Sequence, residues 1–240
     1  MQSINRSNQV ATSRLIMVAI LLIGFGFRLF QLDHNELRSD EAFGYFLSLH
    51  SLSAIVSTTI ELQEPYPVAS HFVAHGWLYI AGDTVFALRF LSVWFGLLSV
   101  ALIYRLTLCL KLNPITAYLA AFLLAINPYA ITYSQDARMY CMSLALTIAL
   151  VWLAIEWLQR QRIQYAIAYI LCATLALYTH YFAAYILLAL YIFVLSRALC
   201  FPGLQNSVIN FMVPLFFIAL LYSPWYERAA TIFSRYHGEG

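Results

Sequence analysis

The stretch LIMVAILLIGFGFRLFQLDHNELRSDEAFGY, residues 15–45, joins an apolar run to a polar segment with two adjacent carboxylates. The run from Leu15 to Leu32 contains one charged residue, Arg28, and is long enough to cross a bilayer as a helix. Asp40 and Glu41 follow a few residues later, beside Arg38. We therefore expect a membrane anchor with acidic groups directly at the membrane surface.

The composition of the whole chain agrees with this interpretation. Its 240 residues are 62% hydrophobic and only 10% charged, and the mean hydropathy is +0.76. Soluble domains carry roughly a quarter of charged residues. The sequence therefore predicts an all-α, polytopic integral membrane protein, with membrane lipids as its surroundings and no sign of a nucleic-acid partner. The four cysteines show neither metal spacing nor a disulfide framework, which favours apolar packing.

Seven membrane spans are expected. The segment from Ile163 to Ser196 would be about 51 Å long as one helix, too long for a hydrocarbon core of roughly 30 Å. Arginines flank it on both sides, so two short spans that turn near Thr179 and His180 fit better. The remaining five are Leu15–Leu32, Thr84–Thr107, Ile115–Ile131 with a kink at Asn127–Pro128, Met139–Leu158 and Val208–Trp225.

Residues 33–83 form a long first outer loop within a single membrane-embedded domain, residues 1–240. Apolar residues from Leu49 to Ile60 recur at helical spacing and predict a helix that lies flat on the membrane and ends at Pro65 and Pro67. A second short apolar segment runs from Val68 to Ala81 and carries His71 and His75.

The distribution of charged residues assigns the ends of the spans to the two sides of the membrane. The basic residues at one set of ends predict a cytoplasmic side that includes the N-terminus, by the positive-inside rule. Ten of the eleven acids fall on the other side, and Glu156 is the exception. The tail from Glu227 to Gly240 is expected outside. The basic residues concerned are Arg6, Arg14, Arg105, Lys111, Arg160, Arg162 and Arg197.

Acidic residues from three places are expected to meet at the outer face. A carboxylate at a wet cleft can take a proton from a nucleophile, and an arginine can hold a phosphate at two points. With apolar helices below to hold a lipid tail, these groups suit transfer from a lipid-phosphate donor. The acids are Asp40 with Glu41, Glu64 and Asp136, and the residues that could join them are Arg38, Arg138, His71, His75 and His180.

Simpler interpretations stay open for each group. Asp40 and Glu41 are also what the first turn of a helix favours, and Asp136 with Arg138 could be a local salt bridge. Arg28 and Arg89 are interpreted as interfacial residues that extend their charges toward water. His71 and His75 have a metal-binding spacing, yet a zinc site needs a third ligand, so ordinary helix residues are favoured.

Several motifs follow one another along the chain. They are RSDEA at 38–42 with Tyr45, GDTVFALRFLS at 82–92 with Gly96, Asn127–Pro128, YSQDARMY at 133–140 and THYF at 179–182. Together they resemble the dolichyl-phosphate-mannose-protein mannosyltransferase family, a broad bacterial group of GT-C glycosyltransferases that includes aminoarabinose transferases of lipid A. The resemblance covers roughly Leu15 to Arg197.

The resemblance implies an inverting transfer, on the periplasmic face of a bacterial inner membrane, from a polyprenyl-phosphate-linked sugar to a lipid, glycan or protein acceptor. Asp40 matches the family's catalytic base and Glu41 completes its acidic pair. Glu64 stands where aminoarabinose transferases carry a glutamate near the donor phosphate or a metal, so a divalent metal stays open as a cofactor. The remaining candidates for donor phosphate and substrate are Arg138, Asp136, Tyr140, His180 and Arg38.

Two other classes of function stay open from the sequence. Seven spans with buried polar groups could belong to a transporter or receptor. Full members of the family are usually much longer, so the chain also fits an N-terminal portion that is inactive or depends on a partner.

Overall fold

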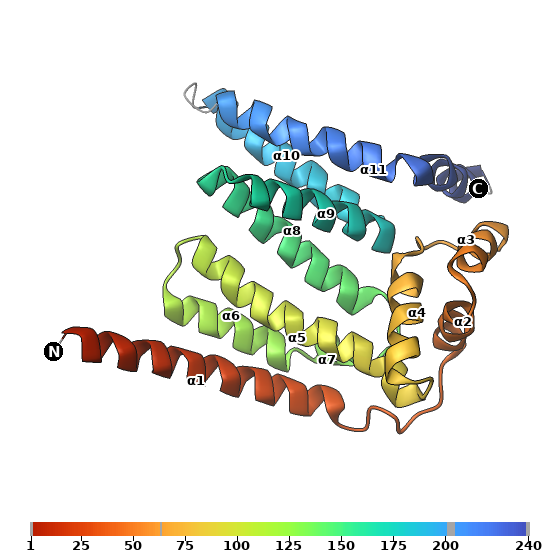
Figure 1. Cartoon of the computed structure of the whole chain (residues 1–240), viewed down its shortest axis with the longest axis horizontal. Coiled ribbons are helices and arrows are strands. Elements are labelled where there is room, and N and C mark those ends of the chain that lie inside the picture. Colours follow the sequence, from red (N-terminus) through yellow and green to blue (C-terminus); the bar gives the residue numbers. More distant parts are fainter. Residues whose placement is uncertain (1, 63, 201–204, 239–240) are drawn as a thin grey trace.

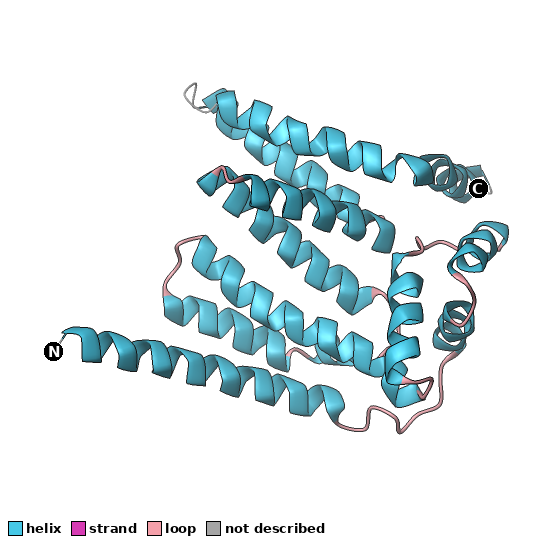
Figure 2. Cartoon of the chain, viewed as in Figure 1, coloured by secondary structure: helices cyan, strands magenta, loops and turns pink. Residues whose placement is uncertain are grey.

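The computed structural model describes residues 2–62, 64–200 and 205–238, and these fold into eleven α-helices without a strand in the described part (Figure 2). The longer helices run roughly alongside one another, and shorter helices gather at one end of them (Figure 1). That end, where α1 (Gln2–Leu29) finishes and α5 (Val85–Cys109) and α8 (Tyr140–Arg160) begin, is called the loop end, and the opposite end the far end. The all-α prediction is confirmed.

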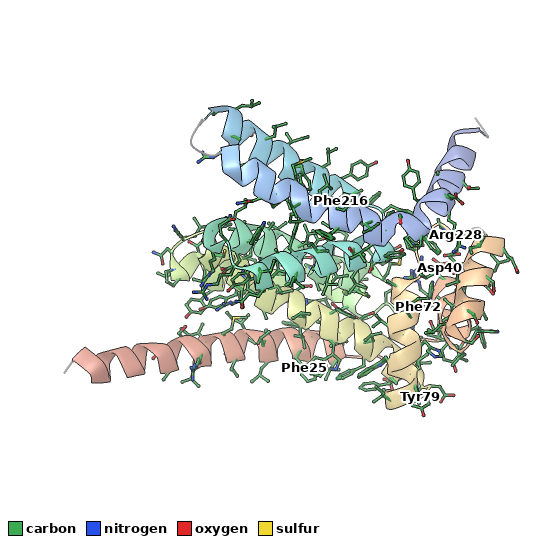
Figure 3. All side chains as sticks on the ribbon, turned by 45° about the horizontal axis from the view of Figure 1, so that its top comes forward. Phe25, Asp40, Phe72, Tyr79, Phe216 and Arg228 are labelled. Atoms are coloured by element: carbon green, nitrogen blue, oxygen red, sulfur yellow. The ribbon has the colours of Figure 1, made fainter. Side chains whose placement is uncertain are left out.

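The first helix, α1 (Gln2–Leu29), leads into the three short helices α2 (Ser39–Ser48), α3 (Leu52–Glu61) and α4 (Ala69–Ala81). In both ribbon views α4 lies across the ends of the long helices (Figures 1 and 3). It packs against α5 and α9. The predicted surface helix is divided, because Leu49 caps α2 and Ser51 accepts a hydrogen bond from the backbone N–H of Ala54 at the start of α3. It ends at Glu61, before the two prolines.

The long helices continue with α5 (Val85–Cys109), α6 (Pro114–Ile126) and α7 (Pro128–Ser134). The expected kink is present: α6 and α7 meet at Asn127–Pro128 with a bend of 57°. Proline has no N–H to donate and cannot continue a helix, whereas it fits well at a helix start. Asn127 accepts a hydrogen bond from the N–H of Ala130 and caps α7.

The last four helices are α8 (Tyr140–Arg160), α9 (Ile163–Thr179), α10 (Ala183–Cys200) and α11 (Gln205–Gly238). The predicted division of the apolar segment is confirmed, because α9 ends at Thr179 and α10 starts at Ala183. α11 continues past the expected end at Trp225, contains Pro214 and Pro224, and changes direction near its C-terminal end (Figure 3). Residues 239–240 of the expected tail lie outside the described residues.

The bundle has the dimensions of a membrane domain. Among the described residues, four helices are long and apolar enough to cross a membrane, and the bent pair α6–α7 makes a fifth. α9 is apolar but has only 17 residues. The protein is therefore a multi-pass membrane protein, and the count of seven spans stays a prediction.

Small side chains let the helices approach closely. Ala117, Ala121 and Ala125 form one fully buried face of α6, and α6 packs against α1 and α5. Large apolar side chains, including Phe216 on α11, point outward over the sides of the bundle, as a lipid-facing surface requires. A cluster of buried apolar residues at the loop end joins α2, α3 and α4 to Trp225 of α11.

Candidate active site

The site starts at α2, whose first turn contains both adjacent acids. The Glu41 carboxylate accepts a hydrogen bond of 3.0 Å from the backbone N–H of Arg38, the residue before the helix. Negative charge is favourable at a helix N-terminus, where backbone N–H groups have no helical partner. The interpretation of Asp40 and Glu41 as first-turn acids therefore holds, and the rest of their surroundings differ sharply.

Glu41 is 1% exposed and forms a two-point ion pair with Arg89 of α5. The Nε and Nη2 atoms of Arg89 each donate to one carboxylate oxygen at 2.9 Å. The backbone N–H of Ala137 adds a third bond, also 2.9 Å. Burial alone would raise the pKa of Glu41, but the bonds from Arg89, Ala137 and Arg38 bring it below its ordinary value. Glu41 is held as a buried anion and touches no open space.

Arg89 also fastens the start of the first outer loop. Its Nη1 donates to the carbonyl oxygens of Leu32 and Asn35, both at 2.9 Å, and its Nη2 to that of Glu36 at 3.1 Å. The interpretation of Arg89 as an interfacial side chain reaching water is wrong, because the residue is only 5% exposed. The sequence offered one signal for the pair: a buried arginine needs a carboxylate, and Glu41 belongs to the nearest acidic pair outside the membrane.

Asp40 lies on the open side of the same helix turn. Its side chain is 62% exposed, and its Oδ2 atom lies 3.1 Å from Nη1 of Arg138, which is itself only 14% exposed. Both residues line a narrow cleft of about 50 Å³ between α2, α4, α5 and the start of α8. Figure 3 places Asp40 at the loop end, close to where α4 meets the bundle.

Arg138 is held from two further sides by aromatic rings. Its guanidinium carbon lies 5.4 Å from the ring centre of Tyr66 and 5.8 Å from that of Tyr140. Cation–π contacts of this kind hold a planar guanidinium without using up its hydrogen-bond donors. Tyr66, in the EPYPV stretch at 64–68, was missed in the sequence; an aromatic residue between two prolines is a rigid position that could have drawn notice.

Glu64 and His71 are two further titratable residues in the lining of the cleft. Burial raises the pKa of Glu64, as does the charge of Asp40, while Arg138 opposes both. Burial, helped by the charge of Arg138, lowers the pKa of His71 to about 4, although a hydrogen bond to the backbone of Gly44 acts the other way. At neutral pH the imidazole of His71 is therefore uncharged beside the Asp40–Arg138 pair.

Asp136 lies behind the cleft rather than in it. Its Oδ2 atom is 3.5 Å from Nη2 of the exposed Arg38, while its Oδ1 atom is buried without a hydrogen-bond partner. Burial and the nearby Glu41 raise the pKa of Asp136, against the lowering effect of Arg38, Arg138 and Arg89. The simple salt bridge between Asp136 and Arg138 is not formed, because each residue pairs with a partner on or beside α2.

His180 reaches the cleft only through Tyr66. The two rings lie 5.3 Å apart, and the Tyr66 ring also contacts Arg138. The His180 side chain accepts a hydrogen bond of 3.2 Å from the backbone N–H of Phe182, and burial lowers its pKa. Of the residues proposed for the donor phosphate and substrate, Arg138 and Glu64 line the cleft, Tyr140 and His180 flank it, and Arg38 and Asp136 lie beside it.

His75, one of the two histidines with metal-binding spacing, lies outside the cleft lining. Nδ1 of His75 lies 2.9 Å from the carbonyl oxygen of Ser48, which ties α4 to α2. In the described part of the chain, no three His, Cys, Asp or Glu side chains come together as a metal site. The described residues therefore do not fit a divalent metal site.

Glu156 is the single acid expected among the basic ends of the spans. It is paired with Arg160.

Arg28 is also a correction. It is fully buried, so the interpretation as an interfacial side chain reaching water is wrong. Its guanidinium contacts α1, α6 and α7 through hydrogen bonds to three carbonyl oxygens and to the Ser134 hydroxyl. The neighbouring Gln135 side chain bonds the carbonyl oxygens at the end of α1, with the shortest distance, 2.8 Å, to Phe30.

These features define an integral membrane protein with a polar cleft at one end of a bundle of apolar helices. The sequence model of the family described as dolichyl-phosphate-mannose-protein mannosyltransferase matches residues 64–226, more than half of the chain. The chain therefore belongs to that family and is a membrane glycosyltransferase of the GT-C type. No curated protein matches the chain. The matched range includes Glu64, Asp136, Arg138 and His180 and begins after α2.

Proposed function

We propose that this protein moves a sugar from a polyprenyl-phosphate donor to an acceptor at the loop end, which faces the outside of a bacterial inner membrane. One observation carries the proposal: the exposed carboxylate of Asp40 lies 3.1 Å from the largely buried guanidinium of Arg138, in the cleft between the outer helices and the bundle. A base and a phosphate-binding cation are the two groups that such a transfer needs.

Asp40 is the general base of this reaction. It removes the proton from the acceptor hydroxyl or amine while the acceptor attacks the anomeric carbon opposite the phosphate. The bond to the phosphate oxygen breaks in the same step, so the configuration at that carbon is inverted. The leaving polyprenyl phosphate carries the negative charge away and needs no strong acid.

Arg138 binds the donor phosphate and stabilises the charge that builds on it. Its contacts support this role, because the two tyrosine rings hold the guanidinium without using up its N–H donors, which stay available to anions. In the resting site the anion is Asp40. A donor phosphate that takes its place would also free the Asp40 carboxylate to accept the proton of the acceptor when the sugar is in position.

The remaining residues have supporting roles in the proposal. Glu64 and Tyr140 shape the space around the phosphate and sugar, and His180 supports Tyr66. Asp136 and Arg38 hold the loop before Arg138, and Glu41 holds α2. The basic far end of the bundle supports a cytoplasmic N-terminus: Arg105 lies in the last turns of α5 and Lys111 just after it, while Arg160 ends α8 and Arg162 precedes α9.

The test is transfer of a labelled sugar from a polyprenyl-phosphate donor in membranes that contain the wild-type protein or Asp40→Asn. We expect transfer to fall by about 10²- to 10⁴-fold, the usual worth of a general base. Glu61→Gln is the matched control, since Glu61 is an exposed acid at the end of α3 and lies outside the cleft. Undiminished transfer by Asp40→Asn would exclude Asp40 as the base.

A further inference from the structure

The buried guanidinium of Arg28 lies at the break between α6 and α7. At a helix break the last carbonyl groups lose their partners. Leu124 would bond the N–H of residue 128, which is a proline and has none. Arg28 replaces the missing donors: its Nη2 lies 3.3 Å from the Leu124 carbonyl oxygen and its Nη1 2.8 Å from that of Ala125.

The site around Arg28 is built to hold its charge without a carboxylate. Each hydrogen-bond partner that the structure gives this guanidinium is neutral, including the Gly24 carbonyl oxygen at 3.0 Å. The freed carbonyls belong to the C-terminal end of α6, where the helix dipole is negative and favours a cation. Arg28 therefore joins α1 to the bent span, and a charge at this depth marks a functional position.

Glycines make the room for it. A Cβ atom at Gly24 would come within 3.2 Å of Nη1 of Arg28, and one at Gly96 of α5 would lie 3.0 Å from its Nε and collide with the Ser134 hydroxyl. Glycines on α1 and α5 thus leave the space that the Arg28 guanidinium occupies.

The fourth contact leads from this site toward the cleft. Nε of Arg28 donates to Oγ of Ser134 at 3.0 Å, and Ser134 is the last residue of α7. The next residue, Gln135, bonds the end of α1, and the N–H of Ala137 bonds Glu41. The loop from 135 to 138 is therefore fixed at its start by α1 and at its end by α2.

We propose that Arg28, acting through Ser134, is a positioning residue for Arg138 and sets where the phosphate-binding guanidinium lies relative to Asp40. This proposal rests on the proposed function for its consequence in turnover, but its structural part does not. Arg28 contacts the neutral groups of three helices and never the substrate. When the link to Ser134 is lost, the loop shifts, the Asp40–Arg138 pair loosens, and donor binding suffers more than the chemical step.

Ser134→Ala tests this with little risk to folding, because it removes one hydroxyl and leaves Arg28 its carbonyl partners. Ser99→Ala is the matched control: Ser99 is equally buried and bonds its own helix at Phe95 just as Ser134 bonds Ala130, and within the described part of the chain it makes no hydrogen bond to the loop. Arg28→Lys is the second variant; lysine keeps the charge but cannot reach all four partners.

Two measurements are made on the purified proteins. The first is the rate at which phenylglyoxal modifies Arg138, followed by mass spectrometry with the exposed Arg162, at the far end of the bundle, as internal reference. The second is the KM for the polyprenyl-phosphate sugar, with kcat. For Ser134→Ala we expect both the Arg138 modification rate and the donor KM to rise roughly three- to tenfold, the worth of one hydrogen bond, with kcat nearly unchanged. Arg28→Lys is expected to exceed both rises.

Equal modification rates for Ser134→Ala, Ser99→Ala and the wild type would overturn the inference, as would a loss confined to kcat. If the wild-type protein transfers no sugar, the proposed function fails, while the modification rates still decide whether Arg28 positions Arg138.

Discussion

Asp40 and Glu41 are neighbours in the chain and carry the same acidic group, yet their surroundings are opposite. Glu41 is 1% exposed, with both oxygens bonded to Arg89 and further bonds from two backbone N–H groups. The Asp40 side chain is 62% exposed and pairs with Arg138 at the cleft. One step along a helix turns a side chain by about 100°, so adjacent acids face different elements. The first turn of α2 thus uses one acid to hold the fold and leaves the other for chemistry.

The largest effect separates the two ion pairs by stability. Arg89→Met leaves Glu41 as a buried carboxylate without its partner, which costs about 3–5 kcal/mol of unfolding free energy. Asp40→Asn breaks an exposed pair, which costs about 1 kcal/mol or less. Unfolding of both variants in detergent measures the difference. Equal losses would mean that the two pairs do the same work.

The next prediction tests whether burial in the cleft wall lowers the pKa of His71. The pKa of His71 is about 4 in the folded protein and about 6.5 when unfolded, so the unfolded chain binds more protons between these values. Stability therefore falls as the pH drops from about 6.5 toward 4, by at most about 3 kcal/mol. His71→Gln should flatten this dependence in melting curves. An unchanged pH profile in that variant would show that the imidazole titrates as if in water.

The third prediction concerns Arg138. Arg138→Lys keeps the charge next to Asp40 but loses the planar two-point contact and the stacking on Tyr66 and Tyr140. We expect polyprenyl phosphate to bind about tenfold more weakly, with the melting temperature nearly unchanged. Arg162→Lys, at an exposed arginine at the far end of the bundle, is the control and should bind as the wild type does.

The smallest effect belongs to Tyr66. Tyr66→Leu removes one of the two rings beside Arg138 and should weaken binding of polyprenyl phosphate about two- to fivefold, as expected for a cation–π contact of this exposure. Tyr66→Phe keeps a ring and serves as the control. If both variants bind equally well, the ring contributes nothing to the guanidinium's position.

The sequence predicted the elements set by hydrophobic length and by proline. The division between α9 and α10 followed from the length of a lipid core, and the bend before Pro128 from the missing N–H. The surface helices were also recognised, although their break at Ser51 was not, since apolar spacing continues through it. Asp40, Glu64 and Arg138 were placed at one face, and all three line the cleft.

The sequence did not predict which charged groups are buried. Arg28 and Arg89 look alike as single arginines near the ends of apolar runs, and hydropathy gives no information about partners. Arg89 is paired with Glu41, from a different helix. Arg28 bonds the carbonyl oxygens of Leu124 and Ala125, which lack helical hydrogen-bond donors because α6 ends there. Such partners depend on how the helices pack, which a single sequence does not specify. Tyr66 was missed for the same reason, because Arg138 reaches it only in the folded chain.

The helix α4 has a consequence for how the cleft could change its width. It crosses the bundle and rests on α5 at one side and α9 at the other, and it contributes His71 to the cleft wall. A spreading of α5 from α9 would therefore displace α4, and with it the His71 side of the cleft.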